Sequence, residues 1–251
     1  MGNDSTNAWG LTGRALPGAY EDNNYGPFRR SRRGEIVAQL TGKPRHALAE
    51  EGSYFFAQNA TNDAATTLAG HAAPVLADAD ATMTKPFIHL RMDPAAGEVR
   101  AYLDYIEIEV ITAGANGTAD SWAAQLDTGA TRVSSGGTAL TRINPNMRSA
   151  TTPLLACLGG AITAGAESVN VRVPGFGQFR PSIQVAGDKY LFVFGGDPET
   201  VGATSIATIA HHVVGLPPVQ LGPTDQFLLA LYSPSQSGAG VYKVRMGWWE
   251  R

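Results

Sequence analysis

The sequence contains one cysteine, Cys157, in 251 residues. A disulfide within the chain is therefore excluded, and so is a zinc site built from several thiolates. Because Cys157 lies in the apolar stretch Leu154–Leu158, we expect a buried thiol that packs as a small apolar side chain.

Charge is also scarce, since only 16% of the residues are charged and the net charge is −3. General binding to nucleic acid needs a concentrated basic surface, so this composition argues against it. No apolar run reaches the length of a membrane span or of a signal-peptide core. We expect a protein without a membrane partner that is made in a cytoplasm.

Motifs that carry chemistry are missing as well. Gly42-Lys43 is followed by Pro44 and lacks the upstream glycine of a phosphate-binding loop, and Gly175–Gly177 opens no helix as a dinucleotide fingerprint would. Asp78 and Asp80 lack the central glycine and closing glutamate of a calcium loop. We therefore expect no enzymatic activity, no catalytic residues and no cofactor.

Two ionisable pairs were the remaining candidates for a metal or acid–base site. His211 and His212 are adjacent, and adjacent residues of a strand point to opposite faces, so we expect no metal site there. Glu107 and Glu109 share one strand face, but basic residues in the preceding run favour surface ion pairing over a general acid–base pair.

Short apolar runs, separated by Gly, Pro, Asn or Asp, fill the chain from residue 36 onward. In Val241–Trp249, apolar residues alternate with Lys243, Arg245 and Gly247, which is the period of a half-buried strand. Phe227–Tyr232 is apolar throughout, as a strand buried on both faces would be. Further predicted strands are Glu35–Leu40, Ser53–Asn59, Ser121–Leu126, Thr131–Val133, Leu140–Ile143, Ser168–Val173, Pro181–Val185, Lys189–Phe194 and Ser205–Val214.

Two alternating runs predict a β-hairpin. Phe87–Met92 and Tyr102–Ile111 flank the turn sequence Asp93–Gly97. The outward side chains of the two strands would then face each other as cross-strand pairs that fix the register. They are His89 and Arg91 on the first run and Glu107 and Glu109 on the second.

No long helical pattern separates these runs, which excludes βαβ units, and one short helical turn is expected at Arg45–Glu51. The sequence predicts an all-β fold over residues 36–251, an antiparallel β-sandwich of jelly-roll type. Because its last strand ends almost at the C-terminus, we expect truncation of that strand to unfold the domain.

Residues 1–35 predict an extended N-terminal arm rich in Gly, Asn and Pro. Its aromatic residues either dock onto a neighbouring molecule or pack back onto the arm's own domain. They are Trp9, Tyr20, Tyr25 and Phe28.

The arm carries the one cluster of like charge in the sequence, formed by Arg29, Arg30, Arg32 and Arg33. Three interpretations are open. The cluster is a solvated basic turn, or it pairs with an acidic partner surface through its guanidinium groups, or it contacts nucleic acid phosphate. The acidic remainder of the chain argues against the third.

Three segments resemble virion structural proteins of tailed bacteriophages, of the decoration, cement or minor capsid type. These are RRGEIVAQLTGKPRHALAEEGSYFFAQNA (32–60), SSGGTALTRINPNM (134–147) and LGPTDQFLLALYSPSQSGAGVYKVRMGWWER (221–251). The resemblance implies a β-rich domain, self-assembly as a homo-oligomer, often a homotrimer, and binding to the major capsid protein or other virion subunits.

The resulting hypothesis is a non-enzymatic virion protein, anchored by its arm to a capsid lattice. A variant of it is a tail or collar fibre. The rival hypothesis is a β-sandwich that binds host glycans, with Trp122, Trp248, Trp249 or exposed tyrosines as stacking platforms, although packing of these aromatics in the core is the alternative fate.

Overall fold

The computed structural model describes residues 28–30, 36–38, 44–59, 67–74, 83–128, 132–195 and 210–251. The chain divides into two compact units, Met1–Glu50 and Glu51–Arg251. In the first unit, β1 (Phe28–Arg30) pairs antiparallel with β2 (Ile36–Ala38), and helix α3 (Pro44–Glu50) follows. The helix confirms the helical turn expected there. The arm predicted to end at residue 35 stays a prediction.

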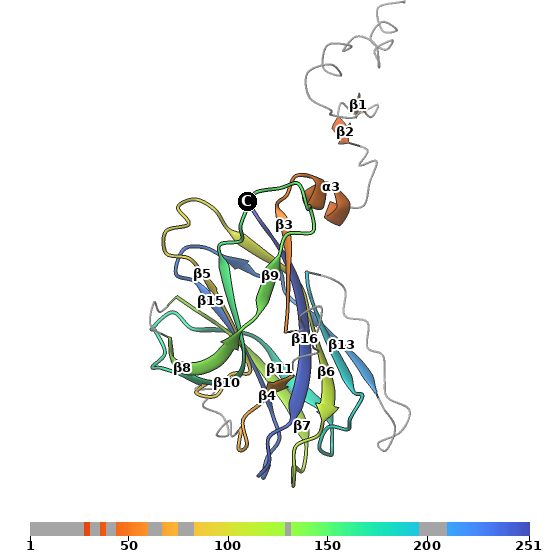
Figure 1. Ribbon diagram of the computed structural model, residues 1–251, viewed down its shortest axis with the longest axis vertical. Coiled ribbons are helices and arrows are strands. Elements are labelled where there is room, and N and C mark those ends of the chain that lie inside the picture. Colours follow the sequence, from red (N-terminus) through yellow and green to blue (C-terminus); the bar gives the residue numbers. More distant parts are fainter. Residues whose placement is uncertain are drawn as a thin grey trace, which may run out of the picture. The chain divides into compact units, whose positions relative to one another are not determined.

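The second unit is built from strands, as Figure 1 shows. In chain order they are β3 (Tyr54–Gln58), β4 (Leu68–Ala69), β5 (Ile88–Met92), β6 (Ala101–Thr112), β7 (Asp120–Asp127), β8 (Val133–Ala139), β9 (Thr141–Ile143), β10 (Leu155–Ala164), β11 (Arg172–Arg180), β12 (Lys189–Phe194), β13 (His211–Leu216), β14 (Gln220–Leu221), β15 (Gln226–Tyr232) and β16 (Val241–Glu250). Most lie within or beside the apolar runs that predicted them.

The strands form two sheets that pack as a sandwich. The six-stranded sheet has the order β11-β7-β15-β5-β10-β8. The eight-stranded sheet has the order β13-β12-β6-β16-β3-β9, with β14 added to β6 and β4 added to β16. The paired strands described in both sheets are antiparallel except β12 and β13, which run parallel. Parallel strands that follow each other in the chain need a long connection, and residues 195–210 supply it. The predicted β-sandwich is confirmed, whereas the jelly roll stays a prediction.

The core lies between the sheets and is filled by alternate side chains of each strand. On β16 the inward residues are Tyr242, Val244, Met246 and Trp248, as the alternation predicted, and each is at most 4% exposed. Trp248 stacks on Phe55 of the neighbouring β3, with ring centroids 5.9 Å apart. Burial of a large apolar side chain stabilises the fold by roughly 1.5–3 kcal/mol, so β16 anchors its sheet.

Strand β15 is buried on both faces, which confirms the interpretation of its unbroken apolar run. Phe227, Leu229 and Leu231 face the core between the sheets. On the opposite side, Leu228 and Ala230 belong to a second apolar cluster with Met83, Ala123 and Ala164. A covered outer face removes the need for polar residues on this strand, because neither side meets water.

The buried side chain of Arg132 holds the segment around Met83 against this outer apolar cluster. Arg132 is 1% exposed, its Nε lies 3.2 Å from Asp127 Oδ2, and its Nη2 donates to Gln125 Oε1 at 2.9 Å and to Glu167 Oε1 at 3.2 Å. A third bond from Nη2 reaches the Met83 carbonyl at 3.4 Å. Because a buried guanidinium is tolerated when its charge and donors are matched, we infer a structural role for this cluster.

The predicted hairpin between Phe87–Met92 and Tyr102–Ile111 is wrong. β5 lies in the six-stranded sheet between β10 and β15, and β6 lies in the eight-stranded sheet between β12 and β16. An alternating run specifies which face is buried but does not specify which strand lies beside it. The turn after Met92 therefore carries the chain from one sheet to the other.

The partners assigned to the outward residues of that hairpin change accordingly. His89 is 3% exposed, and its Nε2 lies 2.6 Å from Gln226 Oε1 on β15. Burial lowers the pKa of His89 to about 4, so its imidazole is neutral at pH 7. Glu107 instead pairs with Arg245 on β16.

Two other predicted strands are not formed as expected. Ser168–Val173 begins with a turn, and Val169 is 98% exposed, so its alternating valines do not mark a buried face. The strand in this region is β11, which begins at Arg172. Pro181–Val185 is irregular, and the Val185 N–H donates to Asp188 Oδ2 at 2.6 Å instead of to a neighbouring strand.

Candidate functional site

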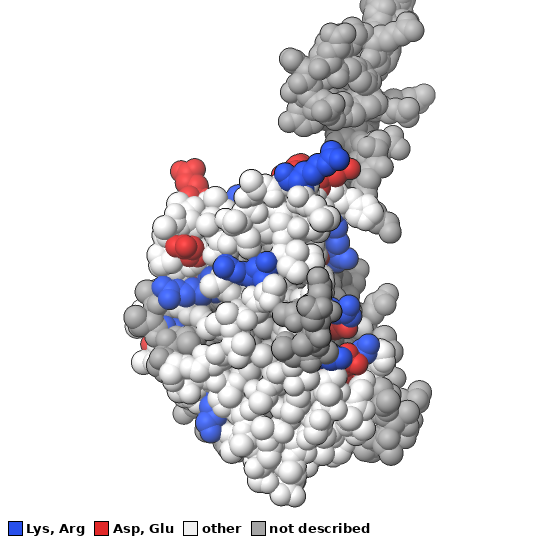
Figure 2. All heavy atoms as spheres, viewed as in Figure 1, with Lys and Arg blue, Asp and Glu red and all other residues white. Residues whose placement is uncertain are grey.

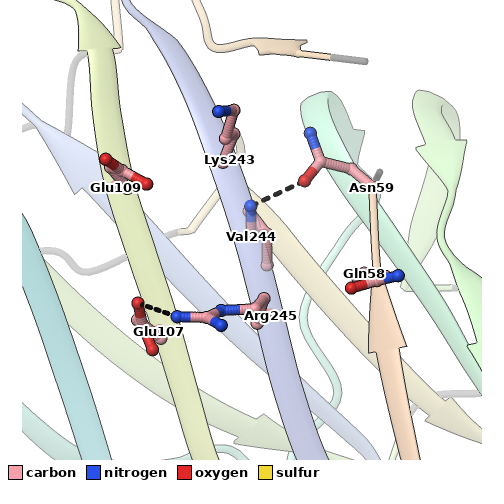
Figure 3. Close-up of a pocket in the computed structure, with 7 residues that line it drawn as sticks. All are labelled: Gln58, Asn59, Glu107, Glu109, Lys243, Val244 and Arg245. Carbon is pink, nitrogen blue, oxygen red and sulfur yellow. Dashed lines mark hydrogen bonds and ion pairs between the residues drawn. The ribbon is translucent and has the colours of Figure 1, made fainter. Parts of the chain in front are cut away.

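The outer face of the eight-stranded sheet carries a groove of about 240 Å³ between β3, β16 and β6 (Figure 3). Side chains at outward positions of β16 and β6 line it, because residues two apart on a strand share a face. The outward residues of the lining are Gln58, Glu107, Glu109, Lys243 and Arg245, and Asn59 and Val244 complete it, although the Val244 side chain belongs to the core.

The pairing register places opposite charges across this groove. Arg245 lies opposite Glu107 and Lys243 lies opposite Glu109. Arg245 Nη2 donates to Glu107 Oε1 at 2.6 Å, and this bond raises the pKa of the arginine. Figure 3 shows Glu109 and Lys243 further along the same groove, without a bond between them. The expectation that Glu107 and Glu109 share one outward face is confirmed.

Asn59 fixes the rim of the groove just beyond the end of β3. Its Oδ1 accepts from the Val244 N–H at 2.7 Å, and its Nδ2 donates to the Tyr242 carbonyl at 3.3 Å. The side-chain amide thus satisfies backbone groups of β16 that a longer β3 would have paired. The backbone beneath the charged residues is therefore fixed.

Aromatic side chains continue the same outward face toward the end of β16. Trp249 lies opposite Tyr102 on β6 and opposite Tyr54 on β3. The rings of Trp249 and Tyr102 are parallel within 8°, with centroids 5.7 Å apart. Such offset stacking contributes about 0.5–1.5 kcal/mol beyond burial, so the two rings hold each other in a defined orientation.

Gly247 makes room for two of these rings. A Cβ at this position would collide with the Tyr54 hydroxyl and would lie 2.6 Å from Tyr105 Cε1. Tyr54 crosses the strand at this point, and its hydroxyl donates to Asp104 Oδ2 on β6 at 2.8 Å. The glycine in the alternating run is thus needed for close approach of side chains from both neighbouring strands.

The structure separates the tryptophans that the sequence offered as stacking platforms. Trp122 is 7% exposed and Trp248 is fully buried, with its Nε1 donating to Glu250 Oε1 at 2.9 Å. Both belong to the core, whereas Trp249 lies half-buried on the outer face. Of these three, Trp249 is the residue that can contact a ligand.

The paired histidines point to opposite sides of β13, as expected. His211 is exposed, whereas His212 is 9% exposed and stacks on Tyr190 at a centroid distance of 5.6 Å. Burial lowers the pKa of His212. Within the described ranges, no three His, Cys, Asp or Glu side chains gather as ligands of a metal ion.

A buried polar cluster lies beside His212. Tyr190 donates its hydroxyl to Asp120 Oδ2, and Arg180 Nη2 donates to Asp188 Oδ1 at 2.8 Å. Burial raises the pKa of Asp120 to about 7 and also raises the pKa of Tyr190. These residues are at most 9% exposed, so the cluster belongs to the interior of the sandwich.

Cys157 is buried at 3% exposure, as expected, and burial raises the pKa of its thiol to about 12. The thiol is therefore protonated at neutral pH and is a poor nucleophile.

A second surface feature lies at the edge of the six-stranded sheet. Among the described strands, β11 pairs only with β7. Three of the four large apolar side chains exposed in the described ranges are on or beside it, namely Val169 at 98%, Val173 at 45% and Phe176 at 76%. An apolar edge strand is prone to contact another molecule.

The residues predicted to anchor the arm fall mostly outside the described part of the chain. Trp9, Tyr20, Tyr25, Arg32 and Arg33 lie outside the described residues. Phe28, Arg29 and Arg30 form β1 and pair with Ala38, Val37 and Ile36. Their role as anchors stays a prediction.

Sequence reasoning identified part of the outer face and missed the rest. It noted Glu107, Glu109 and Trp249 but did not connect them with Tyr54 or Tyr102. The outward positions of the two alternating runs were the available signal, but only the pairing of β6 with β16 shows that these positions share one surface.

In Figure 2 the visible face has scattered Lys, Arg, Asp and Glu between broad uncharged areas. In the part of the chain that the structure describes, no helix has the length and apolar character needed to cross a membrane. Comparison of the chain with protein-family models, curated proteins and solved structures finds no match.

Proposed function

We propose that this chain is a non-enzymatic structural protein of a tailed-phage virion, which joins a capsid or tail lattice through surface contacts. The observation that carries the proposal is the exposed apolar edge of β11, where Phe176 and its neighbours offer a contact surface on a rigid sandwich. Assembly proteins act by summing many such contacts over a symmetric lattice. The resemblance of three sequence segments to virion proteins points the same way.

The proposed assembly is a homo-oligomer, for example a homotrimer, bound to the major capsid protein or to another virion subunit. The N-terminal segment, with Arg29, Arg30, Arg32 and Arg33, would anchor it to an acidic partner surface through charge-assisted hydrogen bonds. A tail or collar fibre is the variant of this proposal that differs only in the position within the particle.

Binding to particles tests the proposal. The full-length protein is mixed with particles assembled without it, and the bound fraction is measured after sedimentation. We expect saturable binding by the wild-type chain and at least about tenfold weaker binding when the four arginines are replaced by serine, a change equivalent to about 1.4 kcal/mol.

The matched control replaces exposed arginines of the sandwich that lie outside β11, Arg148→Ser and Arg251→Ser, which should leave particle binding unchanged. Absence of the protein from purified particles of the phage that encodes it would reject the proposal. Equal binding by the four-arginine variant and the wild type would reject the anchoring role alone.

A further inference from the structure

We propose that the outer face of the eight-stranded sheet binds a neutral oligosaccharide, with the Trp249 and Tyr102 rings contacting sugar C–H groups and the groove beside Glu109 and Lys243 receiving hydroxyl groups. The proposal does not depend on the assembly function proposed above. It assigns a ligand to a surface that self-assembly leaves unexplained.

The aromatic and charged parts form one continuous strip. Along β16 and β6 the outward pairs are Trp249 with Tyr102, Gly247 with Tyr105, Arg245 with Glu107, and Lys243 with Glu109. Outward residues are about 6.7 Å apart along β16, so the four pairs extend over about 20 Å, and the register with β6 is irregular between Gly247 and Trp248. A chain of several sugar units could therefore contact both parts at once.

The charged groups of the strip are of both signs. Glu107 and Arg245 neutralise each other at 2.6 Å. Glu109 adds a carboxylate, and Lys243 adds an ammonium group. A hydroxyl group can donate to the carboxylate and accept from the ammonium group, so a neutral polyhydroxylated ligand satisfies both. A polyanion would meet carboxylates within the same groove, which argues against phosphate or nucleic acid.

The aromatic side chains provide the apolar part of the contact. Trp249 and Tyr102 are half-buried, and their parallel stacking fixes the ring orientation before a ligand arrives. Ordered rings lose little conformational entropy on binding. Sugar rings have apolar C–H faces and polar rims, which matches aromatic rings beside polar groups better than a purely apolar partner would.

An extended peptide fits this surface less well. Peptides that bind to sheets add a strand at an edge, where backbone groups are free to pair. β16 and β6 are interior strands whose backbones are paired on both sides, to β3 and β12 as well as to each other. The face therefore offers side chains alone.

The test is an array of neutral hexose, N-acetylhexosamine and deoxyhexose oligosaccharides probed with the full-length protein, followed by calorimetric titration of the sugars retained. We expect at least one class to bind, with little change between low and high salt because the ligand is uncharged. Trp249→Ala, Glu109→Gln and Lys243→Gln should each weaken binding about tenfold.

Phe176→Ala is the matched control, since Phe176 is an exposed aromatic residue on the other sheet, and it should bind as the wild type does. If Trp249→Ala fails to fold, the two surface variants at Glu109 and Lys243 decide the test. No binding by the intact chain, or wild-type affinity in those two variants, would overturn the proposal. Preference for sulfated or phosphorylated sugars would overturn the assignment of a neutral ligand.

Discussion

At the scale of single residues, the carboxyl group of Asp120 makes the free energy of unfolding depend on pH. Its Oδ1 is buried without a hydrogen-bond partner among the described residues, and burial raises the pKa of the carboxyl from 3.8 to about 7. A raised carboxyl pKa means that the folded protein binds more protons than the unfolded chain between these two values. The free energy of unfolding should therefore fall as pH rises across this window.

Asp120→Asn removes this titrating carboxyl. Relative to that variant, we expect the wild type to lose on the order of 2 kcal/mol in the free energy of unfolding between pH 5 and pH 8. Urea unfolding at several pH values measures it. A difference that is constant over this range would show that Asp120 is ionised in the folded state throughout.

Glu250 at the end of β16 is a second buried residue with a large expected effect. Its carboxylate accepts from the Leu154 and Leu155 N–H groups and from Trp248 Nε1, with Oε1 at 2.9–3.0 Å from the three nitrogens. Glu250→Ala would leave these donors unpaired inside the protein. We expect a loss of about 3 kcal/mol or more in the free energy of unfolding, measured by denaturant titration.

Glu250→Gln is the appropriate control, because the amide oxygen still accepts and the loss should be smaller. Equal stabilities of the alanine variant and the wild type would mean that water replaces the carboxylate.

At the scale of elements, the separation of β5 and β6 into different sheets has a measurable consequence. The partner of Glu107 is Arg245 on β16, with side chains 22% and 60% exposed. A double-mutant cycle on Glu107 and Arg245 with alanine should give a coupling energy of about 0.2–1 kcal/mol.

The same cycle on Glu107 and Arg91 should give no coupling, because these residues lie in different sheets. If Glu107 coupled to Arg91 and did not couple to Arg245, the result would support the hairpin and contradict the observed pairing.

The exposed edge strand β11 predicts a variant that separates association from folding. Phe176→Ser should change the free energy of unfolding by no more than about 0.5 kcal/mol, since a 76% exposed side chain contributes little to the core. It should weaken self-association about tenfold, measured by sedimentation velocity over a range of concentrations.

Met147→Ser provides the comparison, because Met147 is 98% exposed and lies outside β11. If both serine variants associate as the wild type does, the β11 edge is not the surface through which copies meet.

At the scale of the whole molecule, the C-terminal strand determines whether the sandwich folds. β16 lies between β6 and β3 and contributes four inward side chains to the core. Ending the chain after Gly240 should abolish the cooperative thermal transition seen by circular dichroism. Removal of Arg251 alone should preserve that transition, because its side chain pairs with Glu51 at the surface. A cooperative transition in the long truncation would contradict this role.

The sequence alone determined the elements whose burial follows a local period. The alternation of Val241–Trp249 indicated the inward face of β16, the unbroken apolar run indicated a doubly buried β15, and Lys189–Phe194 gave the bounds of β12. Such patterns are visible in one strand at a time, because each residue's burial depends on the face it occupies.

Only the tertiary structure decided which strands lie side by side. Neighbours in a sheet are chosen by packing and hydrogen bonding between segments distant in sequence, and no local pattern encodes that choice. Strand pairing made Arg245, and not Arg91, the partner of Glu107. It also brought Tyr54 across Gly247 and stacked Trp249 on Tyr102. The candidate binding face is therefore a property of strand pairing, since its residues come from three strands that the chain reaches at widely separated points.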